Sequence, residues 1–92
     1  MAATYRFKIM TPAKTVLDAQ IVSMIAPGGA GYLGVLANHA PLLTTLRGGT
    51  LTVKFEDAEK LYRVEGGILR VANNTAVLLS EKVEEVSPEG GG

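Results

Sequence analysis

The sequence is 92 residues long, which is enough for one domain and too short for two. Hydrophobic residues make up 47% of it and charged residues 20%, a balance that predicts a packed core rather than a disordered chain. Nine basic residues balance nine acidic ones, so the chain has no net positive charge with which to bind nucleic acid. The absence of cysteine excludes disulfides, thiolate metal sites and a cysteine nucleophile.

The first third of the sequence predicts three strands. Thr4–Met10 alternates apolar and basic residues with the period of a half-buried strand. Residues 16–17 indicate a short second strand. Residues 19–26 are rich in β-branched side chains and end at Pro27-Gly28-Gly29. A buried helix is the alternative for this third run, but its shortness and abrupt end favour a central strand.

The second half of the sequence predicts further strands joined by turns. Their expected ranges are 50–56, 60–65, 68–72 and 75–80, with residues 81–86 extending the last. The Asn73-Asn74 pair predicts a hairpin turn, since asparagine tolerates positive φ. The glycine pairs at 48–49 and 66–67 are predicted to be turns that separate strands.

Short strands separated by turns, with no helical stretch, predict an antiparallel β-sandwich or barrel spanning residues 1–86. Residues 87–92 are expected to form a flexible C-terminal tail. The residues expected to point inward are apolar and alternate along the strands: Phe7, Ile9, Ile21, Ile25, Leu43, Leu51, Val53, Phe55, Val64, Leu69, Val71, Val77 and Leu79.

The segment Gly31–Leu42 lies within the longest uncharged run of the chain, from Ala19 to Leu46. Turn formers interrupt this run repeatedly, so it contains no stretch of ~20 apolar residues that would span a membrane. A mixture of turn formers and large apolar residues is typical of a bent segment that contacts a partner. On residue chemistry alone, Tyr32 and its neighbouring leucines fit the core and an exposed contact patch equally well.

Candidates for chemistry are few. His39 is the only histidine and has no acidic residue beside it, which fits a turn or interface residue better than a catalytic base. One histidine without cysteine gives few ligands for a metal. The glycine-rich segment 28–31 is not followed by the Lys-Ser/Thr of a phosphate-binding loop. We therefore predict no catalytic residue, no metal site and no cofactor.

The pattern Gly-x-Leu-Gly-Val-Leu-x-Asn-His-Ala-Pro-Leu-Leu-Thr at residues 31–44 resembles the hallmark of the ε subunit of bacterial F-type ATP synthase. Met10-Thr11-Pro12 resembles an early turn of that family. Leu46–Leu51 and Val64–Val71 resemble its later turns, in the same order along the chain. The resemblance extends over residues 4–86.

The resemblance implies a ten-stranded antiparallel β-sandwich of two five-stranded sheets at the foot of the central stalk. Such a subunit links the γ subunit to the membrane c-ring of a proton-translocating synthase. It couples ring rotation to ATP synthesis without being catalytic and without a small-molecule substrate. Its implied location is peripheral, at the cytoplasmic face of the bacterial inner membrane.

The resemblance also implies two sets of contact residues. The c-ring contact falls on Gly28, Gly29, Gly31, Tyr32 and Leu33, and the γ contact falls on Thr11, His39 and Thr44. Many relatives carry an acidic residue where this chain has Tyr32, so we expect an apolar contact here or another residue in the role of the acid.

Most bacterial relatives continue into a C-terminal helical hairpin that these 92 residues do not contain, so inhibition by such a hairpin is not expected of this sequence. The alternative to a rotor subunit is a stand-alone β-sandwich that binds a small ligand or a peptide.

Overall fold

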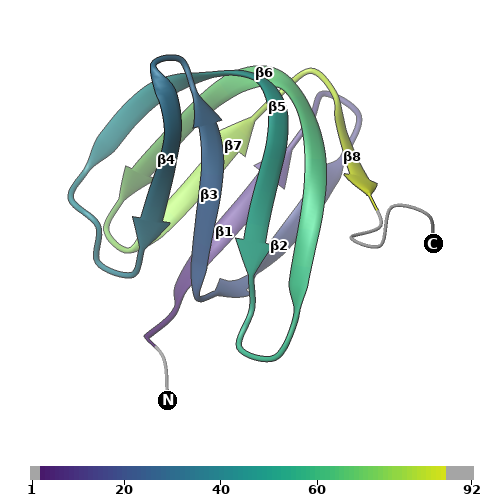
Figure 1. The fold of residues 1–92 in the computed structure, drawn as a ribbon. Helices are drawn as coiled ribbons and strands as arrows, with labels where there is room; N and C mark the ends of the chain where they lie inside the picture. The colour runs from purple at the N-terminus through teal and green to yellow at the C-terminus, as the bar shows by residue number, and fades with distance from the viewer. Residues whose placement is uncertain (1–2, 87–92) are drawn as a thin grey trace.

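Eight β-strands make up most of residues 3–86, the part of the chain that the computed structural model describes (Figure 1). The strands are β1 (Tyr5–Met10), β2 (Thr15–Ile21), β3 (Ser23–Gly28), β4 (Gly31–Leu36), β5 (Leu42–Lys54), β6 (Glu59–Ala72), β7 (Thr75–Leu79) and β8 (Val83–Val86). Within residues 3–86 there is no helix long and apolar enough to cross a membrane. The predicted tail at residues 87–92 lies outside the described residues.

The strands form one hydrogen-bonded sheet in the order β2-β1-β7-β6-β5-β3-β4, and β8 pairs with β6. The β1–β7 pair is parallel, and every other pair is antiparallel. The all-β prediction is confirmed. The finer prediction needs correction, because the structure has eight strands in one mixed sheet rather than ten antiparallel strands in two sheets.

The difference in strand number arises at the two glycine pairs, which bend strands instead of ending them. β5 and β6 are 13 and 14 residues long and stay paired on both sides of these glycines. Gly66 and Gly67 have φ values of 89° and 143°, which side-chain-bearing residues rarely adopt, so the strand bends without leaving the ladder. In Figure 1, β5 and β6 curve from one layer into the other, and β3 and β4 lie in front of β1 and β7.

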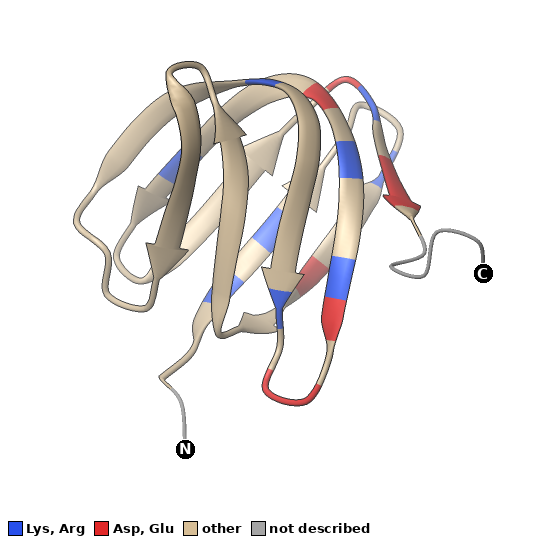
Figure 2. Cartoon of the chain, in the orientation of Figure 1, with Lys and Arg blue, Asp and Glu red and all other residues tan. Residues whose placement is uncertain are grey.

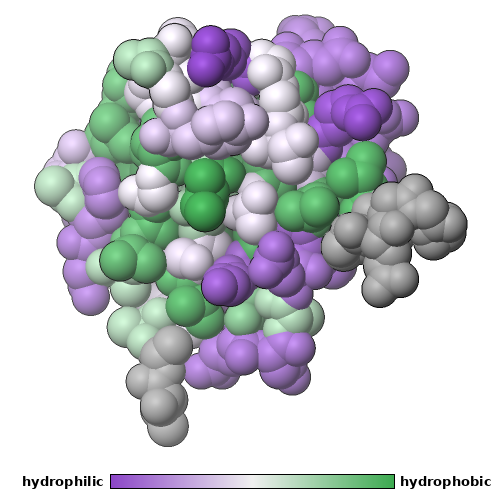
Figure 3. Space-filling view, viewed as in Figure 1, coloured by the Kyte–Doolittle hydropathy of each residue, from purple (hydrophilic) through white to green (hydrophobic). Residues whose placement is uncertain are grey.

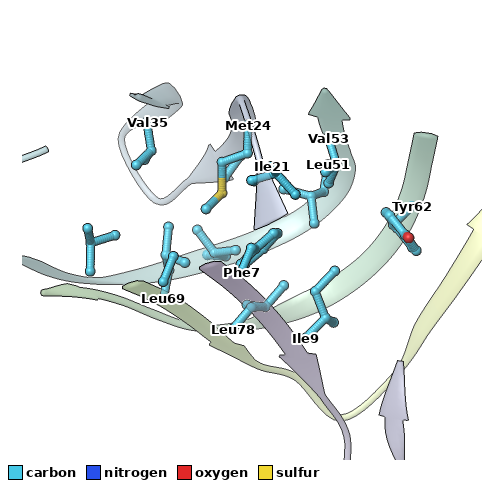
Figure 4. Packing of buried hydrophobic residues seen from close by; sticks show 14 of the residues in the cluster. Phe7, Ile9, Ile21, Met24, Val35, Leu51, Val53, Tyr62, Leu69 and Leu78 are labelled. Atoms are coloured by element: carbon cyan, nitrogen blue, oxygen red, sulfur yellow. The ribbon is translucent and has the colours of Figure 1, made fainter. Parts of the chain in front are cut away.

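The core lies between these two layers. Tyr5, Phe7 and Ile9 all point inward from β1, as strict alternation requires, and Figure 4 shows Phe7 and Ile9 among buried side chains from several strands. Burying each large apolar side chain is worth ~1.5–3 kcal/mol before entropy is subtracted. The buried apolar set is Tyr5, Phe7, Ile9, Ile21, Met24, Ala26, Val35, Leu46, Leu51, Val53, Tyr62, Val64, Leu69, Val71, Ala76 and Leu78.

Three residues predicted to be core are exposed instead. Ile25, Leu43 and Leu79 are 50%, 70% and 50% exposed. In β3 and β7 the neighbours Met24 and Leu78 point inward in their place. In these strands apolar residues occupy both faces, so the sequence pattern is compatible with either phase of the alternation. A shift of one residue moves a whole strand's side chains to the other face.

Candidate functional site

The five residues of the predicted c-ring contact lie together at the β3–β4 hairpin. Its strands pair from Ser23↔Leu36 to Gly28↔Gly31. Close backbone contact at Gly28 and backbone conformation at Gly31 explain why these two positions are glycine. A Cβ on buried Gly28 would lie 2.7 Å from the carbonyl oxygen of Gly31, and Gly31 has φ of 143°. The backbone N–H of Gly29 donates to the carbonyl of Thr45 (3.2 Å), which ties the hairpin turn to β5.

Tyr32 and Leu33 point to opposite faces of β4. Tyr32 is 62% exposed, and its hydroxyl lies near Gly49 on β5, since a Cβ built on Gly49 would lie 3.6 Å from the hydroxyl oxygen and 3.1 Å from the Cβ of Pro27. Leu33 is half-buried and packs against the core. Of the two, Tyr32 therefore presents the side chain that a partner can contact, and Leu33 supports the hairpin from inside.

His39 lies in the loop between β4 and β5. Its backbone N–H donates to the carbonyl of Leu36 (3.2 Å), and its Nδ1 lies 2.7 Å from the carbonyl oxygen of Ala40. A carbonyl can only accept, so Nδ1 carries the proton and Nε2 remains for another partner. His39 is thus held by its own loop, which agrees with a turn or interface residue.

Asn74, in the turn between β6 and β7, holds the loop that contains His39 through its side chain. This role was not predicted from the sequence. The Oδ1 of Asn74 accepts the backbone N–H of Asn38 (2.7 Å), and its Nδ2 donates to the carbonyl of Thr4 (3.1 Å). Asn38, Asn73 and Asn74 all have positive φ, between 53° and 63°. The Asn73-Asn74 pair was predicted to form a turn. The sequence offered one further indication of the bridging role, which is that an amide side chain can both donate and accept a hydrogen bond.

We expect Asn74→Gly to lower the free energy of unfolding by about 1 kcal/mol, because glycine keeps the positive φ but loses both side-chain hydrogen bonds. Urea denaturation and hydrogen exchange at the amide of Asn38 would measure the effect. Asn73→Gly is the matched control, since within residues 3–86 the Asn73 side chain forms no hydrogen bond. Equal losses in the two variants would contradict the bridging role of Asn74.

The three residues of the predicted γ contact do not cluster. Thr11 lies at the C-terminal end of β1, where its Oγ1 accepts the backbone N–H of Lys14 (3.2 Å). His39 lies near the N-terminal end of the same strand, to which Asn74 ties its loop. Thr44 lies between them on β5, half-buried, with Oγ1 3.3 Å from the carbonyl oxygen of Thr45. A single partner would have to span the length of the domain to touch all three.

Two groups of exposed large apolar side chains lie on opposite outer faces of the domain. The first, here called the β7 face, consists of Leu43, Ile68 and Leu79 on β5, β6 and β7. The second, here called the β4 face, consists of Ile25, Tyr32 and Leu36 on β3 and β4. Figure 3 shows the apolar surface over β3 and β4, and Figure 2 shows that these two strands carry no charged residue.

Register places the β7 face between the residues of the predicted γ contact. Ile68 pairs with Thr45 on one side and with Leu79 on the other, and Leu79 pairs with Met10, next to Thr11. Leu43 lies at the other end of the face, and the next residue, Thr44, points to the opposite side of β5, where it pairs with buried Leu69. The sequence reasoning assigned Leu43 and Leu79 to the core and so missed this surface. Within residues 3–86 no group of three or more His, Asp or Glu side chains is arranged to hold a metal ion.

Comparisons with known proteins agree on one family. The family model described as the β-sandwich domain of the ATP synthase delta/epsilon chain matches residues 4–86. The ATP synthase epsilon chain of Moorella thermoacetica is 42% identical over 91 residues, covering 95% of this chain and 68% of that protein. The epsilon chain of Desulforamulus reducens is 42% identical over 86 residues, covering 91% of this chain and 64% of that protein.

Solved structures show the same fold. A chain of the Euglena gracilis mitochondrial ATP synthase, solved as OSCP/F1/c-ring, gives a TM-score of 0.86 at 19% identity, covering 97% of this chain and 59% of that one. A chain from the central stalk/c-ring structure of the Tetrahymena thermophila mitochondrial ATP synthase gives a TM-score of 0.76 at 18% identity. The match covers 89% of this chain and 66% of that one. At these identities the likeness shows the fold alone. The present chain spans about two thirds of the length of the curated relatives.

Proposed function

The chain belongs to the delta/epsilon chain family of ATP synthase, and from this membership we propose that it is a rotor subunit of the central stalk. In this role it links the γ subunit to the membrane c-ring and couples proton-driven ring rotation to ATP synthesis, without catalysing a reaction itself. The observation that carries the proposal is that one small domain exposes two separate apolar surfaces on opposite sides. A linking subunit needs two such surfaces, one for each neighbour.

The β7 face is the surface that we propose for γ. It lies between Thr11 at one end of β1 and His39 at the other, and Thr44 follows Leu43 in β5 with its side chain on the inner side of the strand. An apolar centre with polar residues around it is the usual arrangement of a protein–protein contact. The Nε2 of His39, which forms no hydrogen bond within residues 3–86, adds a polar group at one edge of this surface.

The β3–β4 turn, with Tyr32, is the part that we propose for the c-ring. Gly28, Gly29 and Gly31 keep the turn narrow, and Leu33 anchors it in the core. Tyr32 supplies a contact that is apolar and can also donate one hydrogen bond. Attachment through the complex places the subunit peripherally, at the cytoplasmic face of the bacterial inner membrane.

Tyr32→Arg is expected to weaken attachment of the assembled catalytic head and stalk to membrane vesicles about tenfold. It places a positive charge where an apolar contact is proposed, and the cost of removing that charge from water opposes binding. The matched control is Ala58→Arg, which adds the same charge at an exposed position in the turn between β5 and β6, outside both apolar faces.

The measurement is the fraction of the head and stalk that stays on vesicles through a series of washes. Thermal unfolding of each isolated variant reports whether the domain is still folded. Retention of the Tyr32→Arg assembly at the level of the Ala58→Arg control would contradict the proposed ring contact. Failure of the unchanged chain to co-elute with its γ subunit at micromolar concentration would contradict the proposed function as a whole.

A further inference from the structure

A hollow of about 470 Å³ opens on the outer side of the domain at the Thr11 end of the β7 face. Its lining includes the apolar residues Ile68 and Leu79 and the acidic residues Glu65 and Glu81. Both glutamates are exposed, and they come from different segments, the bend of β6 and the turn that precedes β8. The hollow therefore combines apolar walls with two negative charges.

Backbone hydrogen bonds hold the three segments around this hollow together. The N–H of Ser80 donates to the carbonyl of Met10 (3.0 Å), and the N–H of Glu65 donates to the carbonyl of Lys82 (3.2 Å). The buried hydroxyl of Ser80 donates to the carbonyl of Gly66 (2.6 Å), across the bend of β6. The two glutamates thus project from backbone that is already fixed, which reduces the entropy lost when a ligand is bound.

The two carboxylates have no basic partner within the described chain. The ion pairs among residues 3–86 are Arg6–Asp18 and Lys60–Glu85, and neither involves Glu65 or Glu81. A group that complements this hollow needs an aliphatic portion to lie on Ile68 and Leu79 and a positive end to meet the carboxylates. Lysine and arginine side chains have this construction, with an apolar stem and a charged head.

We infer that this hollow receives a basic side chain of the γ subunit. The inference rests on the proposed function, because the hollow is continuous with the β7 face and contains Thr11, one of the proposed γ contacts. The β7 face then supplies apolar contact area, and the hollow at its end fixes the orientation of γ by a charge interaction. Two carboxylates around one cation would discriminate against a neutral or acidic side chain at that position.

The test is the Kd of the complex with the γ subunit of the same synthase, measured at low and high salt for the unchanged chain and for the Glu65→Gln/Glu81→Gln double variant. We expect the double variant to bind γ at least about tenfold more weakly at low salt, and its Kd to depend less on salt. Glu56→Gln/Glu59→Gln is the control, because it removes the same charge from two exposed positions, one in the turn between β5 and β6 and one at the start of β6. It is expected to leave the Kd within about twofold of the unchanged chain.

The outcomes separate the inference from the function on which it rests. If the unchanged chain binds γ and the double variant binds with the same Kd and salt dependence, the inference is overturned and the proposed function stands. An equal weakening by the control double variant would also overturn it, because the effect would then be one of net charge. If the unchanged chain does not bind γ, the proposed function and this inference fail together.

Discussion

Gly67→Ala is expected to lower the free energy of unfolding by more than about 4 kcal/mol, a large part of the stability of a domain of this size. Gly67 has φ of 143°, and a Cβ placed there would overlap the carbonyl oxygen of Leu79. It would also lie 3.2 Å from the Cβ of Ser80. The overlap is with backbone at the β6–β7 pairing, so no rotamer change can relieve it, and the β6 bend would have to open.

Gly31→Ala is the control that separates backbone strain from steric overlap. Gly31 has the same φ of 143°, but a Cβ there would meet no atom within 4 Å. Strain alone should cost about 1–3 kcal/mol, so this variant should fold. Urea denaturation followed by circular dichroism would measure both variants. Similar losses at Gly31 and Gly67 would show that the bend of β6 tolerates a side chain, contrary to the expectation.

The glycine pairs show where sequence reasoning could predict the fold and where it could not. Gly66-Gly67 was recognised as a place where the chain changes direction, which is correct. The sequence does not show whether such a pair ends a strand or bends it, because glycine permits both. That decision comes from the partner strand β5, which continues past its own glycine pair and keeps β6 in the ladder.

Core prediction succeeded where one face of a strand is polar and was wrong where both faces are apolar. In β1, Arg6 and Lys8 leave no doubt that Phe7 and Ile9 point inward. In β7, Val77, Leu78 and Leu79 are consecutive apolar residues, and the sequence offers no reason to bury Leu78 rather than its neighbours. The same ambiguity hid the β7 face, so the proposed γ surface could be recognised only from the structure.

In the candidate site, too, features set by neighbouring residues could be predicted from the sequence, and features set by residues far apart in the chain could not. The turn at Gly28–Gly31 is encoded by neighbouring residues, and its position could be predicted. The support of the His39 loop depends on Asn74, which is 36 residues from Asn38. A hydrogen bond over that separation leaves no pattern in a single sequence, because it depends on how the β6–β7 turn and the β4–β5 loop meet.

Leu43→Asp is expected to weaken binding of the γ subunit about 100-fold, an effect of ~2.7 kcal/mol. Leu43 is 70% exposed in the isolated domain and lies on the β7 face, next to Thr44. In the proposed complex a partner covers this side chain. An aspartate there would replace the apolar contact with a carboxylate that loses its hydration on binding, even beside its cross-strand neighbour Arg70. Binding by isothermal titration calorimetry, at fixed salt concentration, would measure the change.

Leu36→Asp is the control for the Leu43→Asp variant. Leu36 is 65% exposed, also lies on an uncharged outer surface, and would suffer the same loss of strand propensity from aspartate. It belongs to the β4 face, on the opposite side of the domain, so the Kd for γ should stay within about twofold. Because both leucines are already exposed to water, neither variant should lose much stability, and thermal unfolding would establish that both are folded. If Leu36→Asp weakened γ binding and Leu43→Asp did not, γ would bind the β4 face, and the two outer faces would have to exchange their proposed roles.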